Sequence, residues 1–262
     1  MKKITTILST CILACIAGCG TGKPNTIMQV STIDALLSGA YQSRMSCKKL
    51  TSYGNFGVGT FDKLDGEMVL LNGKMYQITA EGKVRKPKKN LTTPFATVVK
   101  FRKDSVIKLK NKADFERFKN IIDEFAPETN IFCAIKINGR FSKMKVRSLP
   151  AQTEPFEPIT EALKNQSVFE FENVRGTIVG FRFPAYINRV NIPGYYLNFI
   201  SRDRKRGGHI LSFELEEGIG EIDVCNRLLI VLPLGETSFS EIDLNVDRSS
   251  ELENLLKQTP EK

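Results

Sequence analysis

Residues 192–213 constrain the fold more than any other part of this chain, because they predict a β-hairpin with a fixed pattern of facing side chains. A Pro-Gly turn opens the segment, and residues 195–200 then form an aromatic and aliphatic run typical of a strand. Side chains two apart on a strand share a face, so Tyr196 and Asn198 lie together. A basic turn and a Gly-Gly pair follow, and His209 leads the second strand. We expect Tyr196, Asn198 and His209 to lie close together.

A second hairpin is predicted earlier in the chain. Residues 67–71 and 74–79 have strand composition and are separated by Asn72-Gly73. This dipeptide is typical of two-residue hairpin turns, since both positions require a positive φ angle. The pattern therefore indicates an antiparallel pair of strands.

The middle of the chain predicts a helix followed by two strands. Asn111 is expected to cap a helix over residues 112–125, in which apolar side chains recur at helical spacing. Strands are expected over residues 131–137 and 143–149, with Gly139 turning the chain between them. This part of the chain therefore mixes a helix with strands.

Two segments of the chain resemble the alpha-acetolactate decarboxylase family. The first matches the family pattern G-x-G-T-F-x-x-L-D-G-E at residues 57–67. The second is the 192–213 hairpin, which matches at Gly194-Tyr195, Phe199, Asp203-Arg204 and Gly207-Gly208-His209. In the family three histidines of this hairpin bind a catalytic zinc ion. His209 matches the third of them, whereas Tyr196 and Asn198 stand at the first two positions.

The resemblance implies an α+β fold of two similar halves, each with a mixed β-sheet and helices. We place these halves at residues 31–150 and 151–262, with the metal-site hairpin in the second. Before them we expect a signal peptide at residues 1–19 and a tether at residues 20–30. The family commonly forms dimers, so a homodimer is a further expectation.

Two more site residues are implied by the resemblance. A glutamate that approaches the metal site falls on Glu67, and an arginine that holds or protonates the substrate falls on Arg147. From the residues alone, each would be read as a surface charge on a strand. The family also uses a glutamate near the C-terminus, and its position here is either Glu253 or is taken by Leu256.

The resemblance implies decarboxylation of 2-acetolactate to acetoin with zinc as the cofactor, but the ligand set departs from the pattern. Zinc sites normally have three or four nitrogen, sulfur or carboxylate ligands. Asn198 offers only an amide oxygen, and Tyr196 would have to ionise from a pKa of about 10. His209 is the chain's one histidine. We therefore expect weak or absent zinc binding and an impaired enzyme.

The alternative is a protein without catalysis that binds a small anionic ligand in the retained cleft. Arginine suits a carboxylate because it stays charged and offers paired donors. The basic residues expected to line that cleft are Arg147, Arg202, Arg204, Lys205 and Arg206. Glu67, Arg147 and His209 favour the enzyme, whereas Tyr196 and Asn198 favour the binding protein.

The N-terminus has the pattern of a bacterial lipoprotein signal. Lys2 and Lys3 precede an apolar stretch that is too short to span a bilayer comfortably, and Ile-Ala-Gly then leads to Cys19. We expect lipidation of Cys19 and an exported protein anchored to the cell envelope, in the outer membrane if the cell has one. An ordinary cleaved signal and an uncleaved anchor are the alternatives.

The net charge of +9 favours anionic small molecules or surfaces as partners. The sequence lacks the interleaved aromatic and basic residues of a nucleic-acid module, so no nucleic-acid partner is expected.

Overall fold

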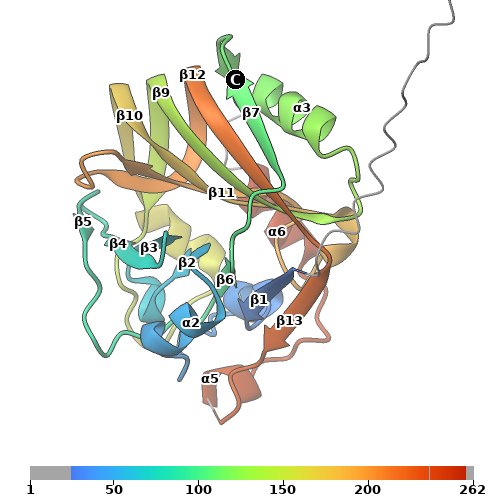
Figure 1. Ribbon diagram of the computed structural model, residues 1–262. Helices are drawn as coiled ribbons and strands as arrows, with labels where there is room; N and C mark the ends of the chain where they lie inside the picture. The colour runs from blue at the N-terminus through green and yellow to red at the C-terminus, as the bar shows by residue number, and fades with distance from the viewer. Residues whose placement is uncertain (1–24, 236, 258–262) are drawn as a thin grey trace, which may run out of the picture.

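A computed structural model describes residues 25–235 and 237–257 of the chain. The expected signal peptide, Cys19 and most of the tether lie outside the described residues. Within the described part, no helix has the length and apolar character needed to cross a membrane. Two β-sheets form the body of the protein, and short helices pack around them (Figure 1).

The first sheet has seven strands, in the order β13–β1–β6–β2–β3–β4–β5. Neighbouring strands are antiparallel except β1 and β13, which are parallel. The β3–β4 hairpin turns at Asn72 and Gly73, whose φ angles of 52° and 74° confirm the predicted turn. The strands are β1 (Thr26–Val30), β2 (Phe56–Thr60), β3 (Glu67–Leu71), β4 (Lys74–Ile78), β5 (Val84–Arg85), β6 (Ala96–Val99) and β13 (Arg227–Val231).

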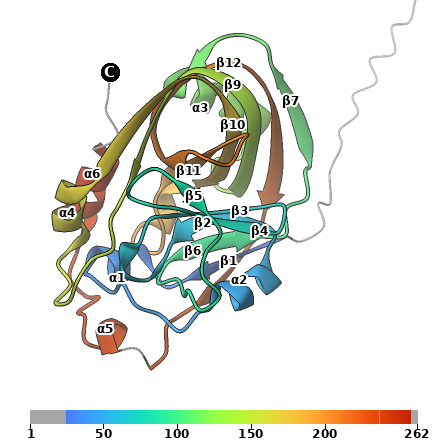
Figure 2. The same cartoon turned by 90° about the vertical axis from the view of Figure 1, so that its left-hand side faces the viewer.

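The second sheet has six strands, and four of them close into a ring. β11, β10, β9 and β12 pair in that order, and β11 also pairs with β12 (Figure 2). β7 and β8 extend the sheet along β12. The strands are β7 (Ser105–Leu109), β8 (Ala113–Asp114), β9 (Phe132–Ser148), β10 (Ser167–Phe183), β11 (Gly194–Ser201) and β12 (Gly207–Cys225).

Gly139 does not turn the chain, contrary to the prediction. It lies inside β9, where it faces Gly176 of β10 and Gly218 of β12. A Cβ atom added at Gly139 would lie 2.6 Å from Leu215 Cδ1 and 2.9 Å from the Glu217 carbonyl oxygen. The glycine therefore permits close approach of neighbouring strands rather than a break in the strand.

The helices are short and pack against the two sheets. They are α1 (Ile33–Leu37), α2 (Cys47–Tyr53), α3 (Phe115–Phe125), α4 (Ile159–Ala162), α5 (Thr237–Ser240) and α6 (Ser249–Lys257). Three 3-10 turns accompany them: η1 (Asp62–Leu64), η2 (Leu163–Asn165) and η3 (Ala185–Ile187). In Figure 2, α1, α4 and α6 gather on one side of the protein.

The central helix α3 begins later than the sequence suggested. Asp114, not Asn111, accepts the capping hydrogen bond, from the amide of Arg117 at 2.8 Å. Phe118 and Ile122 are buried, whereas Phe125 is 50% exposed because it lies at the last position of the helix.

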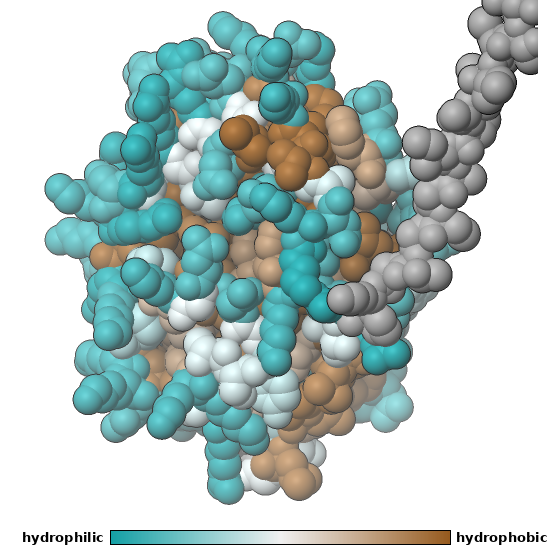
Figure 3. All heavy atoms as spheres, in the orientation of Figure 1, coloured by the Kyte–Doolittle hydropathy of each residue, from teal (hydrophilic) through white to brown (hydrophobic). Residues whose placement is uncertain are grey.

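Most of the face shown in Figure 3 is hydrophilic, with apolar side chains in small groups.

The two sheets draw strands from both sides of the expected boundary at residue 150. β13 belongs to the second half but completes the sheet of the first, and β9 belongs to the first half but lies in the ring. The alternation predicted for β11 is confirmed. Leu197 and Phe199 pack inside the ring with α3, whereas Tyr196 and Ile200 pack in the core between the sheets.

Candidate functional site

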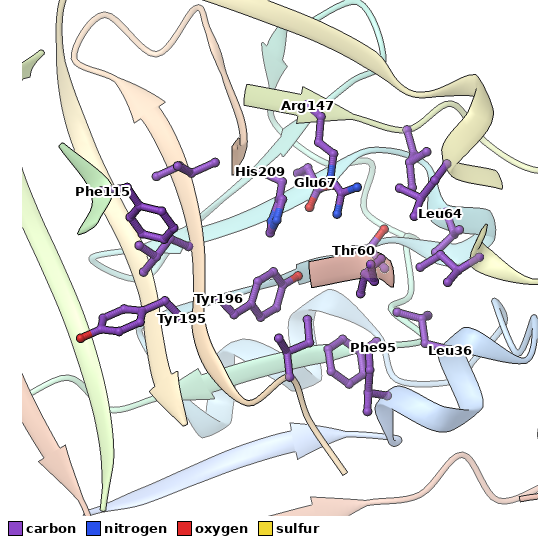
Figure 4. A pocket seen from close by; sticks show the side chains of 18 residues that line it. Leu36, Thr60, Leu64, Glu67, Phe95, Phe115, Arg147, Tyr195, Tyr196 and His209 are labelled. Carbon is purple, nitrogen blue, oxygen red and sulfur yellow. The ribbon is translucent and has the colours of Figure 1, made fainter. Parts of the chain in front are cut away.

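Four of the residues singled out in the sequence line one pocket between the two sheets (Figure 4). Its volume is ≈ 80 Å³, and its lining includes Glu67, Arg147, Tyr196 and His209. Glu67 comes from β3 of the seven-stranded sheet, and the other three come from strands of the ring. The pocket is thus assembled only when the two sheets pack together.

Strand register places three of the polar residues in one row. Asn198 of β11 pairs directly with His209 of β12, and His209 pairs directly with Arg147 of β9. Residues directly opposite each other on neighbouring strands have side chains about 4.5–5.5 Å apart at Cβ. The expected proximity of Tyr196, Asn198 and His209 is therefore confirmed, and Arg147 joins them from a third strand.

Both ends of the Asn198 side-chain amide form hydrogen bonds with other residues of the protein. Its side chain is 0% exposed, and its Nδ2 donates to the Met68 carbonyl oxygen at 3.0 Å. That carbonyl can only accept, so the amide oxygen faces His209, whose Nδ1 lies 3.2 Å away. His209 therefore carries its proton on Nδ1, which leaves the lone pair of Nε2 available to the pocket.

Glu67 and Arg147 form a buried pair of opposite charges. Burial raises the pKa of Glu67 to about 7, while the Arg147 charge and a hydrogen bond from Asn198 oppose the rise. Burial also lowers the pKa of Arg147, against the stabilising charge of Glu67. Gln166 adds a further contact, since its Oε1 accepts from Arg147 Nη1 at 3.3 Å. No local signal in the sequence pointed to Gln166.

The raised pKa of Glu67 predicts a loss of stability as the pH rises. The folded protein keeps the Glu67 proton up to a pKa of about 7, whereas the ordinary value is 4.5. Stability from this group is therefore fully present below pH 4.5 and is lost as the pH rises through 7, by about 3 kcal/mol. Urea unfolding across this range should show the loss, and Glu67→Gln should remove it. Glu124→Gln is the control, because Glu124 is exposed. The prediction would be contradicted if the free energy of unfolding fell with pH as steeply in the Glu67→Gln protein as in wild type.

The two rings beside this pair stay neutral. Burial raises the pKa of Tyr196 well above its ordinary value, and the negative charge of Glu67 raises it further. Burial lowers the pKa of His209 well below its ordinary value, and the Arg147 charge lowers it further. The ring centroids of Tyr196 and His209 lie 5.6 Å apart. At neutral pH the pocket therefore presents a phenol and a neutral imidazole.

The two candidates for a C-terminal glutamate are resolved in part. Glu253 is exposed on α6 and does not line the pocket, whereas Leu255 of the same helix does. The side chain of Leu256 lies outside the described residues. α6 thus brings an aliphatic side chain, not a carboxylate, to the pocket from its described positions.

The basic turn between β11 and β12 does not line the pocket, contrary to the prediction. The Arg204 guanidinium lies over the Tyr76 ring at 5.6 Å, and that of Arg206 over Phe171 at 5.2 Å. Arg202 and Lys205 are exposed. These residues point away because the turn extends past the end of the β11–β12 pair. Of the basic residues predicted for the cleft, only Arg147 lines the pocket.

Within residues 25–235 and 237–257, no group of three His, Cys, Asp or Glu side chains is arranged to hold a metal ion. Glu67 and His209 are the pocket-lining residues of these types, and they come from different sheets.

Comparison with known proteins gives one consistent family. The family model described as alpha-acetolactate decarboxylase matches residues 27–246. An alpha-acetolactate decarboxylase of Methanosarcina mazei is 42% identical over 233 residues, which are 89% of this chain and 81% of that protein. The Bacillus subtilis strain 168 protein of the same name is 37% identical over 227 residues, covering 87% and 89% of the two chains.

The fold agrees with this relationship. A crystal structure of alpha-acetolactate decarboxylase from Bacillus subtilis strain 168 matches with a TM-score of 0.85 and 35% identity, covering 89% of this chain and 98% of that chain. The α+β class expected from the sequence is confirmed. The chain belongs to the alpha-acetolactate decarboxylase family.

Proposed function

We propose that this protein binds a small carboxylate in the pocket at Arg147 and that its decarboxylation of 2-acetolactate to acetoin is weak or absent. The observation that carries the proposal is the state of Asn198. It stands where the family has a zinc ligand, and its amide is bound on both sides, to Met68 and to His209.

The residues present do not fit a zinc ion. The Asn198 oxygen already accepts from His209, and amide oxygens are poor zinc ligands. Tyr196 would bind zinc as a phenolate, but burial and Glu67 raise its pKa well above its ordinary value. Glu67 and His209 alone supply fewer than the three protein ligands of a catalytic zinc site. Outer contacts tune a zinc site but do not replace missing ligands.

Carboxylate binding is supported by the charge and position of Arg147. Arg147 is 7% exposed and lines the pocket beside the neutral Tyr196 and His209. A buried arginine binds a carboxylate through charge-assisted hydrogen bonds, which are stronger than neutral ones. Glu67, with a pKa of about 7, can take up a proton when an anion enters and so limits the repulsion.

A second candidate is a working decarboxylase. Glu67, Arg147 and His209 all match the family, and all three line the same pocket. This arrangement favours retained activity if the protein recruits a metal through ligands other than Tyr196 and Asn198.

We also propose that the protein is exported and anchored to the cell envelope by lipid on Cys19, and that it forms a homodimer. The basic n-region, apolar stretch and lipobox of residues 1–19 support the anchor. The family resemblance supports the dimer.

Elemental analysis and an acetoin assay on the same untagged sample separate the two candidates. We expect well under one zinc per chain and no acetoin above a blank, in a protein that unfolds cooperatively. Stoichiometric metal, together with acetoin formation that is lost in His209→Ala, would instead establish the decarboxylase. Acetate or pyruvate binding that is lost in Arg147→Met would support the carboxylate site.

A further inference from the structure

We infer that the pocket selects linear monocarboxylates with an aliphatic tail, with the carboxylate on Arg147 and the tail on a wall of aliphatic side chains. The inference rests on the proposed carboxylate site and adds the class of ligand to it. It follows from how polar and apolar residues divide the pocket between them.

The polar side chains that line the pocket come from strands, which also supply the apolar Leu197 and Ile210. Five short helical segments, α1, η1, α4, η2 and α6, each contribute an aliphatic side chain to the lining: Leu36, Leu64, Ile159, Leu163 and Leu255. We call these five residues the aliphatic wall. In Figure 4, Leu36 and Leu64 lie on the opposite side of the pocket from His209.

The aliphatic wall offers nothing to a second polar group. Its five side chains are buried, with exposed fractions between 1% and 6%, and belong to the core between the sheets. Of the described residues that line the pocket, the charged types are Glu67 and Arg147, both at the strand side. A ligand end that lay against these five side chains and carried a hydroxyl or a second carboxylate would bury that group against carbon atoms only, which is unfavourable.

The size of the pocket limits the length of the tail. Its volume is ≈ 80 Å³, so it holds more than a single water molecule but only a small ligand. The homologous series described next measures which tail length fits.

The first test is binding of a homologous series to the full-length protein at one fixed pH. Acetate, butyrate and hexanoate are titrated by calorimetry, with the weaker acids measured in competition with hexanoate. We expect affinity to rise about fourfold per methylene, the increment for burying one CH₂ group. Hexanol, which lacks the carboxylate, and 6-hydroxyhexanoate, which has a polar tail end, should each bind at least about tenfold more weakly than hexanoate.

A variant of the wall tests where the tail lies. Leu255→Ala shortens a side chain of α6 that lines the pocket, and it should weaken hexanoate about fourfold or more while leaving acetate unchanged. Leu229→Ala is the matched control, because Leu229 is 43% exposed on β13 and does not line the pocket. Far-UV circular dichroism of both variants checks that the fold is intact.

The outcomes separate this inference from the proposed function. If acetate binds but affinity does not rise from acetate to hexanoate, the inference about the aliphatic tail is wrong, whereas the proposed carboxylate site stands. Hexanol binding as tightly as hexanoate would overturn the inference as well, because the head group would then contribute nothing. If no acid binds at all, the proposed function fails, and the inference fails with it.

Discussion

Replacing Tyr196 and Asn198 together with histidine is expected to give a protein that binds one zinc ion and forms acetoin from 2-acetolactate. Both side chains point to the same face of β11, and position 198 is directly opposite His209. The ring of Tyr196 already lies 5.6 Å from that of His209. Three imidazoles would then converge beside Glu67, which is a ligand set that zinc favours.

The expected gain in zinc affinity is large. Loss of a single outer-shell partner already costs roughly 10–100-fold in metal affinity, and the double variant adds two direct ligands. Each single variant should bind zinc more weakly than the double. Because zinc binds the folded protein only, it should also raise the midpoint of thermal unfolding of the double variant.

The measurement is zinc content by elemental analysis after dialysis, with acetoin assayed on the same untagged sample. Tyr186→His is the control, since Tyr186 is 64% exposed and does not line the pocket. Wild-type protein that already holds zinc as tightly as the double variant would refute the proposal that Asn198 and Tyr196 prevent metal binding.

The sequence predicted the parts of the site that depend on local pattern. The two-residue period of β11 placed Tyr196 and Asn198 on one face, and Asn72-Gly73 fixed the β3–β4 turn. These features depend on neighbours in the chain. The position of Arg147 beside His209 depends instead on the pairing of β9 with β12, and only the family resemblance pointed to it.

The errors arose where partners distant in the chain decide the outcome. The sequence predicts a turn at Gly139 because glycine is common in turns, but the role of Gly139 depends on Gly176 and Gly218 in two other strands. The sequence does not predict the aliphatic wall, because its five residues come from segments far apart in the chain that only the packing of α1, α4 and α6 brings together. It predicts Arg206 in the cleft because Arg206 is close to His209 in the chain, whereas the Arg206 guanidinium packs on Phe171.

Arg147→Met is expected to weaken carboxylate binding at least tenfold and to destabilise the protein in a pH-dependent way. The loss of a charge-assisted hydrogen bond, worth about 1.5–3 kcal/mol, should weaken acetate or hexanoate at least tenfold. Removing one partner of a buried ion pair typically costs about 3–5 kcal/mol, because the other charge is left without compensation. Here Glu67 can avoid being a buried negative charge without a partner by taking up a proton, since its pKa is already about 7.

The cost of Arg147→Met should therefore grow with pH. At pH 5.5 Glu67 is protonated with or without Arg147, so the loss of stability is small. Above pH 7 the folded variant still holds a proton on Glu67 that the wild-type protein releases. The free energy of unfolding of the variant therefore falls, relative to wild type, by about 1.4 kcal/mol for each further pH unit. Urea unfolding between pH 5.5 and 8.5 measures this. In a Glu67→Gln background the same substitution should cost an amount that does not change with pH.

Arg140→Met provides the matched control, because Arg140 lies on the same strand but is 45% exposed and pairs with Glu216 and Glu217 at the surface. Exposed ion pairs contribute about 0–1 kcal/mol, so this variant should lose little stability at any pH and should keep carboxylate binding. If Arg147→Met behaved like Arg140→Met, the Arg147–Glu67 pair would not be a buried charge pair, and the carboxylate site would lose its cation. A pH-dependent loss confined to Arg147→Met, and removed by Glu67→Gln, would instead tie the ligand site to that one pair.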